Sequence, residues 1–97
     1  EAQERKRHEA KLRNQRHRVI GPLKKKVEKL EDQISSLEEM QKIRSEELSD
    51  VAVYENKSRR LELLDGFQTA AAKLERLNVQ WETSVLELEK LEAEMER

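Results

Sequence analysis

The sequence is poor in the residues that build compact cores, sheets and many kinds of functional site. It contains no cysteine, one proline, two glycines and only one each of Trp, Tyr and Phe. The absence of cysteine excludes disulfides and thiolate metal sites, and it suits the reducing cytoplasm, where we expect the protein to reside. No apolar run approaches the roughly 20 residues that cross a bilayer, so we expect no membrane partner.

The residues that are present favour long helices. Charged residues make up 42% of the 97-residue chain and apolar residues 35%, a balance too polar for a closed globular core and typical of coiled coils. A chain this small and polar predicts no enzyme activity of its own. Its first residue is Glu1 rather than methionine, so we expect a segment of a longer protein.

A first heptad pattern follows the single proline. Gly21-Pro22 interrupts the helical pattern, because proline fits the first turn of a helix and disrupts the turn before it. We therefore expect a basic N-terminal arm over residues 1–21, helical in part, and a first coiled-coil helix over residues 22–48. Its apolar seam consists of Leu23, Val27, Leu30, Ile34 and Leu37. Polar residues take the next two seam positions, and we expect the apolar face to pass instead to Met40, Ile43 and Leu48.

A longer pattern predicts a second coiled-coil helix over residues 58–97. Its apolar side chains repeat at alternating steps of three and four, with Gly66 on the outer face. The predicted seam positions are Leu64, Phe67, Ala71, Leu74, Asn78, Trp81, Val85, Leu88, Glu92 and Met95. Residues 49–57 have no sustained period and contain Ser, Asp and Asn, so we expect a hairpin turn there, with Asn56 or Ser58 capping the second helix.

These elements predict an all-α fold, an antiparallel two-helix coiled-coil hairpin with a basic, partly helical N-terminal arm. The register pairs residues whose numbers add up to about 108–112, and the paired rod is about 55 Å long, at 1.5 Å per residue. The C-terminus then lies level with residue 12 or 13. The arm is therefore expected to overhang the stem or to run beside its acidic end.

Charge is distributed unevenly along the chain. Residues 1–26 hold ten Lys and Arg against three acids, a formal net charge of +7, whereas residues 27–97 hold ten bases against eighteen acids, which leaves −8. Such a basic segment favours a polyanionic partner, although Lys and Arg also serve simply to solvate an amphipathic helix. The candidate nucleic-acid-binding residues are Arg5, Lys6, Arg7, Lys11, Arg13, Arg16, Arg18, Lys24, Lys25 and Lys26.

The composition of the arm predicts how it would bind nucleic acid. Counterion release from phosphates gives sequence-independent affinity that falls steeply with salt. The arm has no aromatic residue, so its contacts are expected to reach backbone phosphates rather than stacked bases. Its arginines suit bidentate phosphate contacts better than lysines would.

The remaining candidate side chains have structural explanations that we favour. Trp81 and Phe67 occupy predicted seam positions and are expected to pack in the core rather than to stack on bases. Asn78, also at a predicted seam position, would fix the register. Tyr54 either packs at the hairpin tip or is presented to a partner. Solvated positions, rather than metal or acid–base sites, are expected for His8, His17, Glu38, Glu39, Glu46 and Glu47.

Three stretches, in order, resemble the C-terminal appendage of ABC-F proteins, the ATP-binding-cassette ATPases that lack a transmembrane domain. They are PLKKKVEKLE at residues 22–31, LSD leading to Tyr54 at residues 48–54, and LERL leading to Trp81-Glu82 at residues 74–82. Each motif alone is compatible with any heptad pattern, so their order and spacing carry the resemblance.

The resemblance implies a parent protein similar to ATPases with two nucleotide-binding cassettes that act on the ribosome in translation. ATP and Mg²⁺ are implied for that parent by the resemblance alone, and its cassettes would precede Glu1. The chain itself has no phosphate-binding loop of the form GxxxxGK[ST], so we expect no cofactor here.

The leading hypothesis is a coiled-coil appendage that contacts DNA or ribosomal RNA through its basic arm, with the ribosome as a further partner. The alternative is a structural coiled coil for protein–protein interaction that binds no nucleic acid. The two seams could also pair between chains, but a monomeric hairpin is the expected state.

Overall fold

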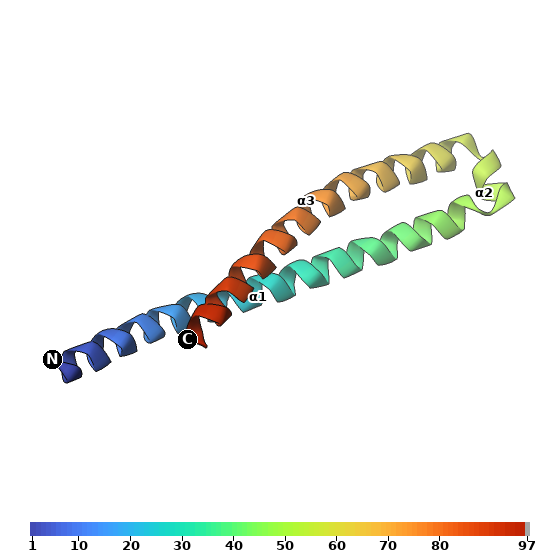
Figure 1. Ribbon diagram of the computed structural model, residues 1–97. Coiled ribbons are helices and arrows are strands. Elements are labelled where there is room, and N and C mark those ends of the chain that lie inside the picture. The colour runs from blue at the N-terminus through green and yellow to red at the C-terminus, as the bar shows by residue number, and fades with distance from the viewer. Residues whose placement is uncertain (97) are drawn as a thin grey trace.

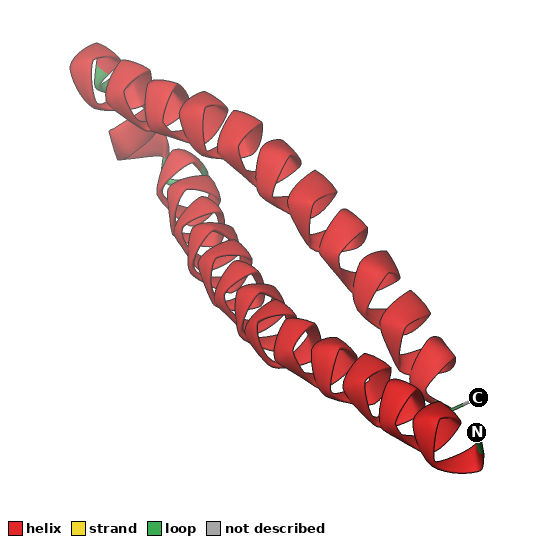
Figure 2. Cartoon of the chain, turned by 90° about the vertical axis from the view of Figure 1, so that its left-hand side faces the viewer, coloured by secondary structure: helices red, strands yellow, loops and turns green. Residues whose placement is uncertain are grey.

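The computed structural model describes residues 1–96 as two long helices joined through a short one (Figure 1). Helix α1 runs from Ala2 to Leu48, α2 from Val51 to Glu55 and α3 from Lys57 to Met95. No strand occurs within these residues. Helices α1 and α3 lie side by side and antiparallel in both views (Figures 1 and 2), which confirms the all-α hairpin.

Helix α1 continues without a break through Gly21-Pro22, so the first helix begins 20 residues earlier than the predicted coiled-coil helix and the arm is helical from Ala2 onward. Proline lacks the N–H group that would bond the carbonyl of Arg18. The flanking residues explain why the helix survives this loss, because Ile20 and Leu23 are both buried against α3. Tertiary packing thus outweighs the local preference of the proline.

Two polar caps form the hairpin tip. The Asp50 carboxylate accepts a hydrogen bond from the Ala52 amide at 2.9 Å and caps α2. The Asn56 side chain accepts one from the Arg59 amide at 3.1 Å, which confirms Asn56 as the cap of α3. The five-residue helix α2 was not predicted, because one helical turn has no detectable periodicity.

On α1, the buried residues are Ile20, Leu23, Val27 and Leu30, and the same seam continues through half-buried residues to Leu48. The predicted shift of the apolar face is wrong, because Met40 and Ile43 are exposed while Gln41 and Arg44 stay at the seam. The missing side chain of Gly66 on α3 explains this result. A Cβ built on Gly66 would lie 2.9 Å from Arg44 Nε, so the glycine leaves room for the guanidinium. Gly66 therefore faces α1, and its predicted outer position is also wrong.

On α3, three of the ten predicted seam positions are wrong, because the buried column there runs one residue earlier, whereas Val85 and Glu92 are half-buried. The buried positions are Leu63, Ala70, Leu77 and Ser84, with Phe67, Leu74, Trp81 and Leu88 half-buried between them. Asn78 is exposed, so it cannot fix the register, and Leu64 and Ala71 are exposed as well. The buried column alternates a large and a small side chain, which lets apolar residues of α1 fill the space beside Ala70 and Ser84.

Cross-helix hydrogen bonds establish the register. Trp81 Nε1 donates to Glu31 Oε1 at 3.1 Å, and Gln41 Nε2 donates to the Phe67 carbonyl at 2.8 Å. Their residue numbers add up to 112 and 108, which confirms the predicted register. Trp81 is half-buried at the seam, and its indole N–H forms the hydrogen bond to Glu31 at the edge of the seam. Buried tryptophan side chains commonly find such a partner for the N–H.

The molecule is a narrow rod with extents of 78 × 16 × 15 Å. Its N-terminal end extends past the C-terminal end of α3, so the first turns of α1 overhang the paired stem (Figure 1). None of the helices in residues 1–96 combines the length and the apolarity that crossing a membrane requires.

Candidate nucleic-acid interface

All ten predicted binding residues lie on α1, and their charge is concentrated in its middle part. Residues 10–27 contain seven of them and no acid. Residues 1–9, which overhang the stem, contain three bases and three acids, so their side chains carry no net charge. The net positive charge therefore lies in the segment of α1 beside α3 and not at the free end of the arm.

Three cations form a stripe on the face of α1 that points away from α3. Lys11, Arg18 and Lys25, which we name the cationic stripe, follow one another at seven-residue intervals and are exposed. Two turns of helix separate neighbours, a rise of about 10.5 Å. They lie about half a turn from the buried residues Leu23 and Val27, so nothing in the fold covers them.

The stripe is extended by one residue at each end. Arg7 precedes Lys11 by four residues, and Lys29 follows Lys25 by four; both are exposed. Lys29 was not among the predicted binding residues because it lies outside the segment with the strongest net charge. Its i, i+4 spacing from Lys25 was the signal that would have included it.

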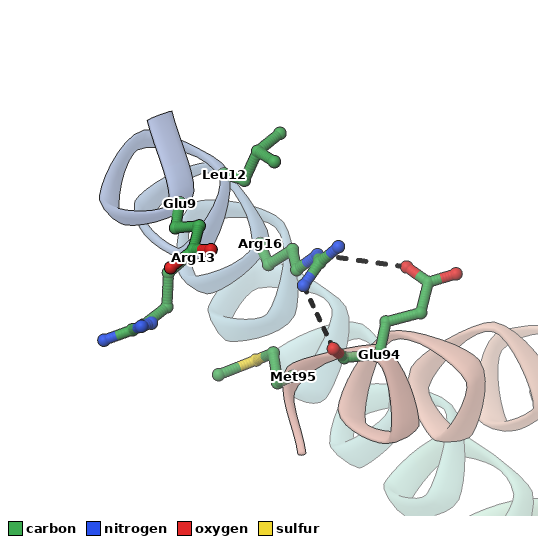
Figure 3. Close-up of a pocket in the computed structure, with 6 residues that line it drawn as sticks. All are labelled: Glu9, Leu12, Arg13, Arg16, Glu94 and Met95. Atoms are coloured by element: carbon green, nitrogen blue, oxygen red, sulfur yellow. Dashed lines mark hydrogen bonds and ion pairs between the residues drawn. The ribbon is translucent and has the colours of Figure 1, made fainter. Parts of the chain in front are cut away.

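Two of the predicted residues are turned toward α3 instead. Arg16 Nη1 donates to the Glu94 carbonyl at 3.0 Å, and its Nε lies 4.0 Å from the Glu94 carboxylate (Figure 3). Lys24 Nζ lies 3.7 Å from Glu92 Oε1. These contacts hold the end of α3 against α1. Both pairs are partly exposed, so each contributes at most about 1 kcal/mol to stability.

A shallow hollow marks the place where α3 ends on α1. Leu12 and Met95 form its apolar part, and Glu9, Arg13 and Arg16 its polar part, together with Glu94 (Figure 3). Arg13 is exposed and makes no ion pair within residues 1–96. The position of the hollow agrees with the predicted level of the C-terminus, at residue 12 or 13.

Acidic residues of α3 lie across the rod from the cationic stripe. Residues 84–96 contain five glutamates and one lysine. Because the helices are antiparallel, these glutamates lie beside the acid-free segment of α1, and Glu92 and Glu94 form the two ion pairs described above. At this end of the rod, the outer face of α1 is therefore positive over residues 10–27, and the adjacent end of α3 is rich in acidic residues.

Arginines of the hairpin tip make local contacts. Arg59 Nη2 bonds the Glu47 carboxylate, and this hydrogen bond, with the charges of Glu47 and Glu62, raises the pKa of Arg59. The Arg60 guanidinium lies 5.3 Å from the centre of the Tyr54 ring and donates to the Tyr54 carbonyl at 2.6 Å. Tyr54 is nevertheless 53% exposed, so an arginine covers one side of its ring and the rest faces solvent.

The other candidate side chains are mostly exposed. His8, His17, Glu38, Glu39 and Glu46 are exposed, whereas the predicted solvated position is wrong for Glu47, which is half-buried and paired with Arg59. No group of three or more metal-ligating side chains exists in the part of the chain that the structure describes.

Comparisons of the chain with protein-family models, with curated proteins and with solved structures find no match.

Proposed function

We propose that this chain is a coiled-coil appendage that contacts DNA or ribosomal RNA through the cationic stripe. The observation that carries this proposal is the acid-free segment of residues 10–27, whose exposed cations recur every seven residues on one helix face. The resemblance described above adds the setting: an ABC-F-like ATPase that acts on the ribosome in the cytoplasm. ATP and Mg²⁺ would then be bound by the cassettes of the parent, and this chain would catalyse nothing itself.

A continuous helix supports this function because it holds the cations at fixed intervals along one line. Each phosphate that a lysine or arginine neutralises releases condensed counterions, and the logarithm of the association constant falls by about 0.9 per phosphate for each tenfold rise in salt on duplex DNA. Three stripe residues, with Arg7 and Lys29 at the ends, would contact about three to five phosphates. Such a contact recognises charge and shape and not base sequence.

Fluorescence anisotropy with labelled duplex DNA and with a ribosomal RNA hairpin tests the proposal. We expect the triple variant Lys11→Gln/Arg18→Gln/Lys25→Gln to bind at least tenfold more weakly at 50 mM salt. The slope of log affinity against log salt should fall by about 2–3 in magnitude. The matched control Lys42→Gln/Lys57→Gln/Lys73→Gln removes the same charge from exposed positions outside the stripe. Failure of the unmodified chain to bind at low salt, or equal losses in both variants, would contradict the proposal.

A second candidate function is protein–protein interaction through the hairpin tip. It is favoured by the exposure of three apolar or aromatic side chains there, Val51, Tyr54 and Leu61. Chemical cross-linking in the full-length parent distinguishes the two functions. Tip contacts with another protein or with the cassettes should survive high salt, whereas phosphate contacts should be lost.

A further inference from the structure

Helix α3 carries an apolar line on the side that faces away from α1. Ala72, Val79, Leu86 and Ala93, which we name the apolar stripe, are spaced by seven residues and are all exposed. Val79 is 59% and Leu86 61% exposed. The stripe lies midway around the helix from the buried column of Leu77 and Ser84, so it takes no part in the hairpin.

The outer face of α1 shows that such a stripe is not required by the fold. The equivalent positions of α1 are all occupied by charged residues: Lys11, Arg18, Lys25, Asp32, Glu39 and Glu46. A two-helix coiled coil needs one apolar seam on each helix, and α3 has its seam against α1. The apolar stripe is therefore separate from the seam of the hairpin, and it is narrower than a coiled-coil seam because it presents one apolar residue every two turns between polar flanks.

The two flanks of the apolar stripe carry different charges. Glu75, Glu82 and Glu89 lie along one side, each three residues after a stripe position. Arg76, Thr83 and Lys90 lie along the other side, each four residues after a stripe position. All six are exposed, and none forms an ion pair within residues 1–96.

We propose that the apolar stripe binds a second copy of this chain, with the two α3 helices parallel. In a parallel pair related by a two-fold axis, the flank with the glutamates on one helix faces the flank with Arg76 and Lys90 on the other helix. Glu75 would then face Arg76 of the second copy, and Glu89 would face Lys90. An antiparallel pair would place the glutamate flanks against each other, and like charges would oppose it.

This inference does not depend on the proposed nucleic-acid function, and it leaves each hairpin intact. A monomer is expected from the two seams alone, because they pair with each other within the chain. The apolar stripe is a third surface, which this pairing leaves exposed. In the parallel dimer, both cationic stripes would lie on the outside of the assembly and both basic segments at the same end. The contact is short, with four apolar layers over about 30 Å, so the dimer should be weak and depend on concentration.

Sedimentation equilibrium from about 10 to 500 µM tests the association. We expect the apparent mass to rise from 11.5 kDa toward twice that value as concentration increases. The variant Val79→Glu/Leu86→Glu should stay at 11.5 kDa throughout. The control Ser35→Glu/Ser36→Glu adds the same charge to exposed positions of α1 and should still associate; circular dichroism checks that each variant remains helical. A constant mass for the unmodified chain, or equal association by all three proteins, would overturn the proposal.

Cross-linking tests the orientation, because the chain has no native cysteine. In a parallel pair, residue 79 lies opposite residue 79 of the second copy, within reach of a disulfide. Val79→Cys should therefore oxidise to a covalent dimer at least tenfold faster than Glu39→Cys, an exposed control on α1. Equal rates would overturn the proposal. Preferential linkage of Val79→Cys to Leu86→Cys in a mixture would overturn it as well, since that pairing belongs to the antiparallel arrangement.

Discussion

Arg44 is a long, charged side chain at a seam position that coiled coils usually fill with an apolar residue. Its neighbours satisfy it: Arg44 Nη1 donates to Gln41 Oε1 at 2.9 Å, and Gln41 in turn donates to the Phe67 carbonyl of α3. The guanidinium fits because Gly66 has no side chain. A polar layer between the hairpin tip and the apolar core is thus built from one arginine, one glutamine and one glycine.

This layer predicts that Gly66→Ala and Arg44→Ala are coupled. Alanine is about 1 kcal/mol better than glycine in a helix interior, so Gly66→Ala should stabilise the Arg44→Ala variant by about that amount. In the native chain, the new methyl group would displace the Arg44 side chain, and the gain should fall by about 0.5–1 kcal/mol. Urea unfolding of the four proteins measures the coupling. The same change in unfolding free energy in both backgrounds would mean that Arg44 and Gly66 do not share this space.

At the scale of elements, the continuity of α1 is an effect of packing rather than of local preference. Pro22 lies inside a 47-residue helix and next to Gly21, and the two residues together weaken this part of α1. Neither residue is needed for a turn, because both have helical backbone conformations without positive φ. Packing of Ile20 and Leu23 against α3 keeps the helix intact.

Pro22→Ala should therefore stabilise the hairpin by about 1–3 kcal/mol, since it restores a donor for the Arg18 carbonyl. Gly21→Ala provides a matched comparison with a smaller expected gain of about 1 kcal/mol, because a Cβ there meets no atom within 4 Å. Thermal unfolding followed by circular dichroism gives both values. A loss of stability in Pro22→Ala would show that the native helix depends on a bend at this residue.

The hairpin and its register were predictable because the period of apolar residues identifies two helices and their capping residues identify the bend. The buried column of α3 was not, because two adjacent columns compete. One contains Leu64 and Val85, the other Leu77 and Leu91, and only contact with α1 selects the second. The ion pairs of Arg16 and Lys24 were equally unpredictable, since their partners Glu94 and Glu92 lie 78 and 68 residues away in the chain.

At the scale of the whole molecule, antiparallel folding brings the acidic end of α3 beside the acid-free segment of α1. Packed helices lie about 8–10 Å apart. A phosphate bound on the cationic stripe lies on the far side of α1, farther from the glutamates of α3 than this axis spacing, so the Debye length of about 10 Å at 0.1 M salt screens most of the repulsion there and less of it at lower salt. At low salt these glutamates should repel the phosphate, and the measured affinity should reflect the stripe and this opposing charge together.

Neutralising glutamates at the C-terminal end of α3 that form no ion pair within residues 1–96 should therefore strengthen nucleic-acid binding. We expect Glu87→Gln/Glu96→Gln to raise affinity about two- to fivefold at 50 mM salt, and the gain should disappear near 0.5 M salt as the Debye length shortens. Glu39→Gln/Glu46→Gln changes the net charge equally, but Glu39 lies about 20 Å along α1 from Lys25, the nearest residue of the cationic stripe. Anisotropy titrations at three salt concentrations compare the two variants. A gain limited to the α3 variant means that phosphates bind beside the C-terminal end of α3, where the cationic stripe lies. Equal gains would mean that only net charge attracts the nucleic acid, and a specific role for the stripe would then be refuted.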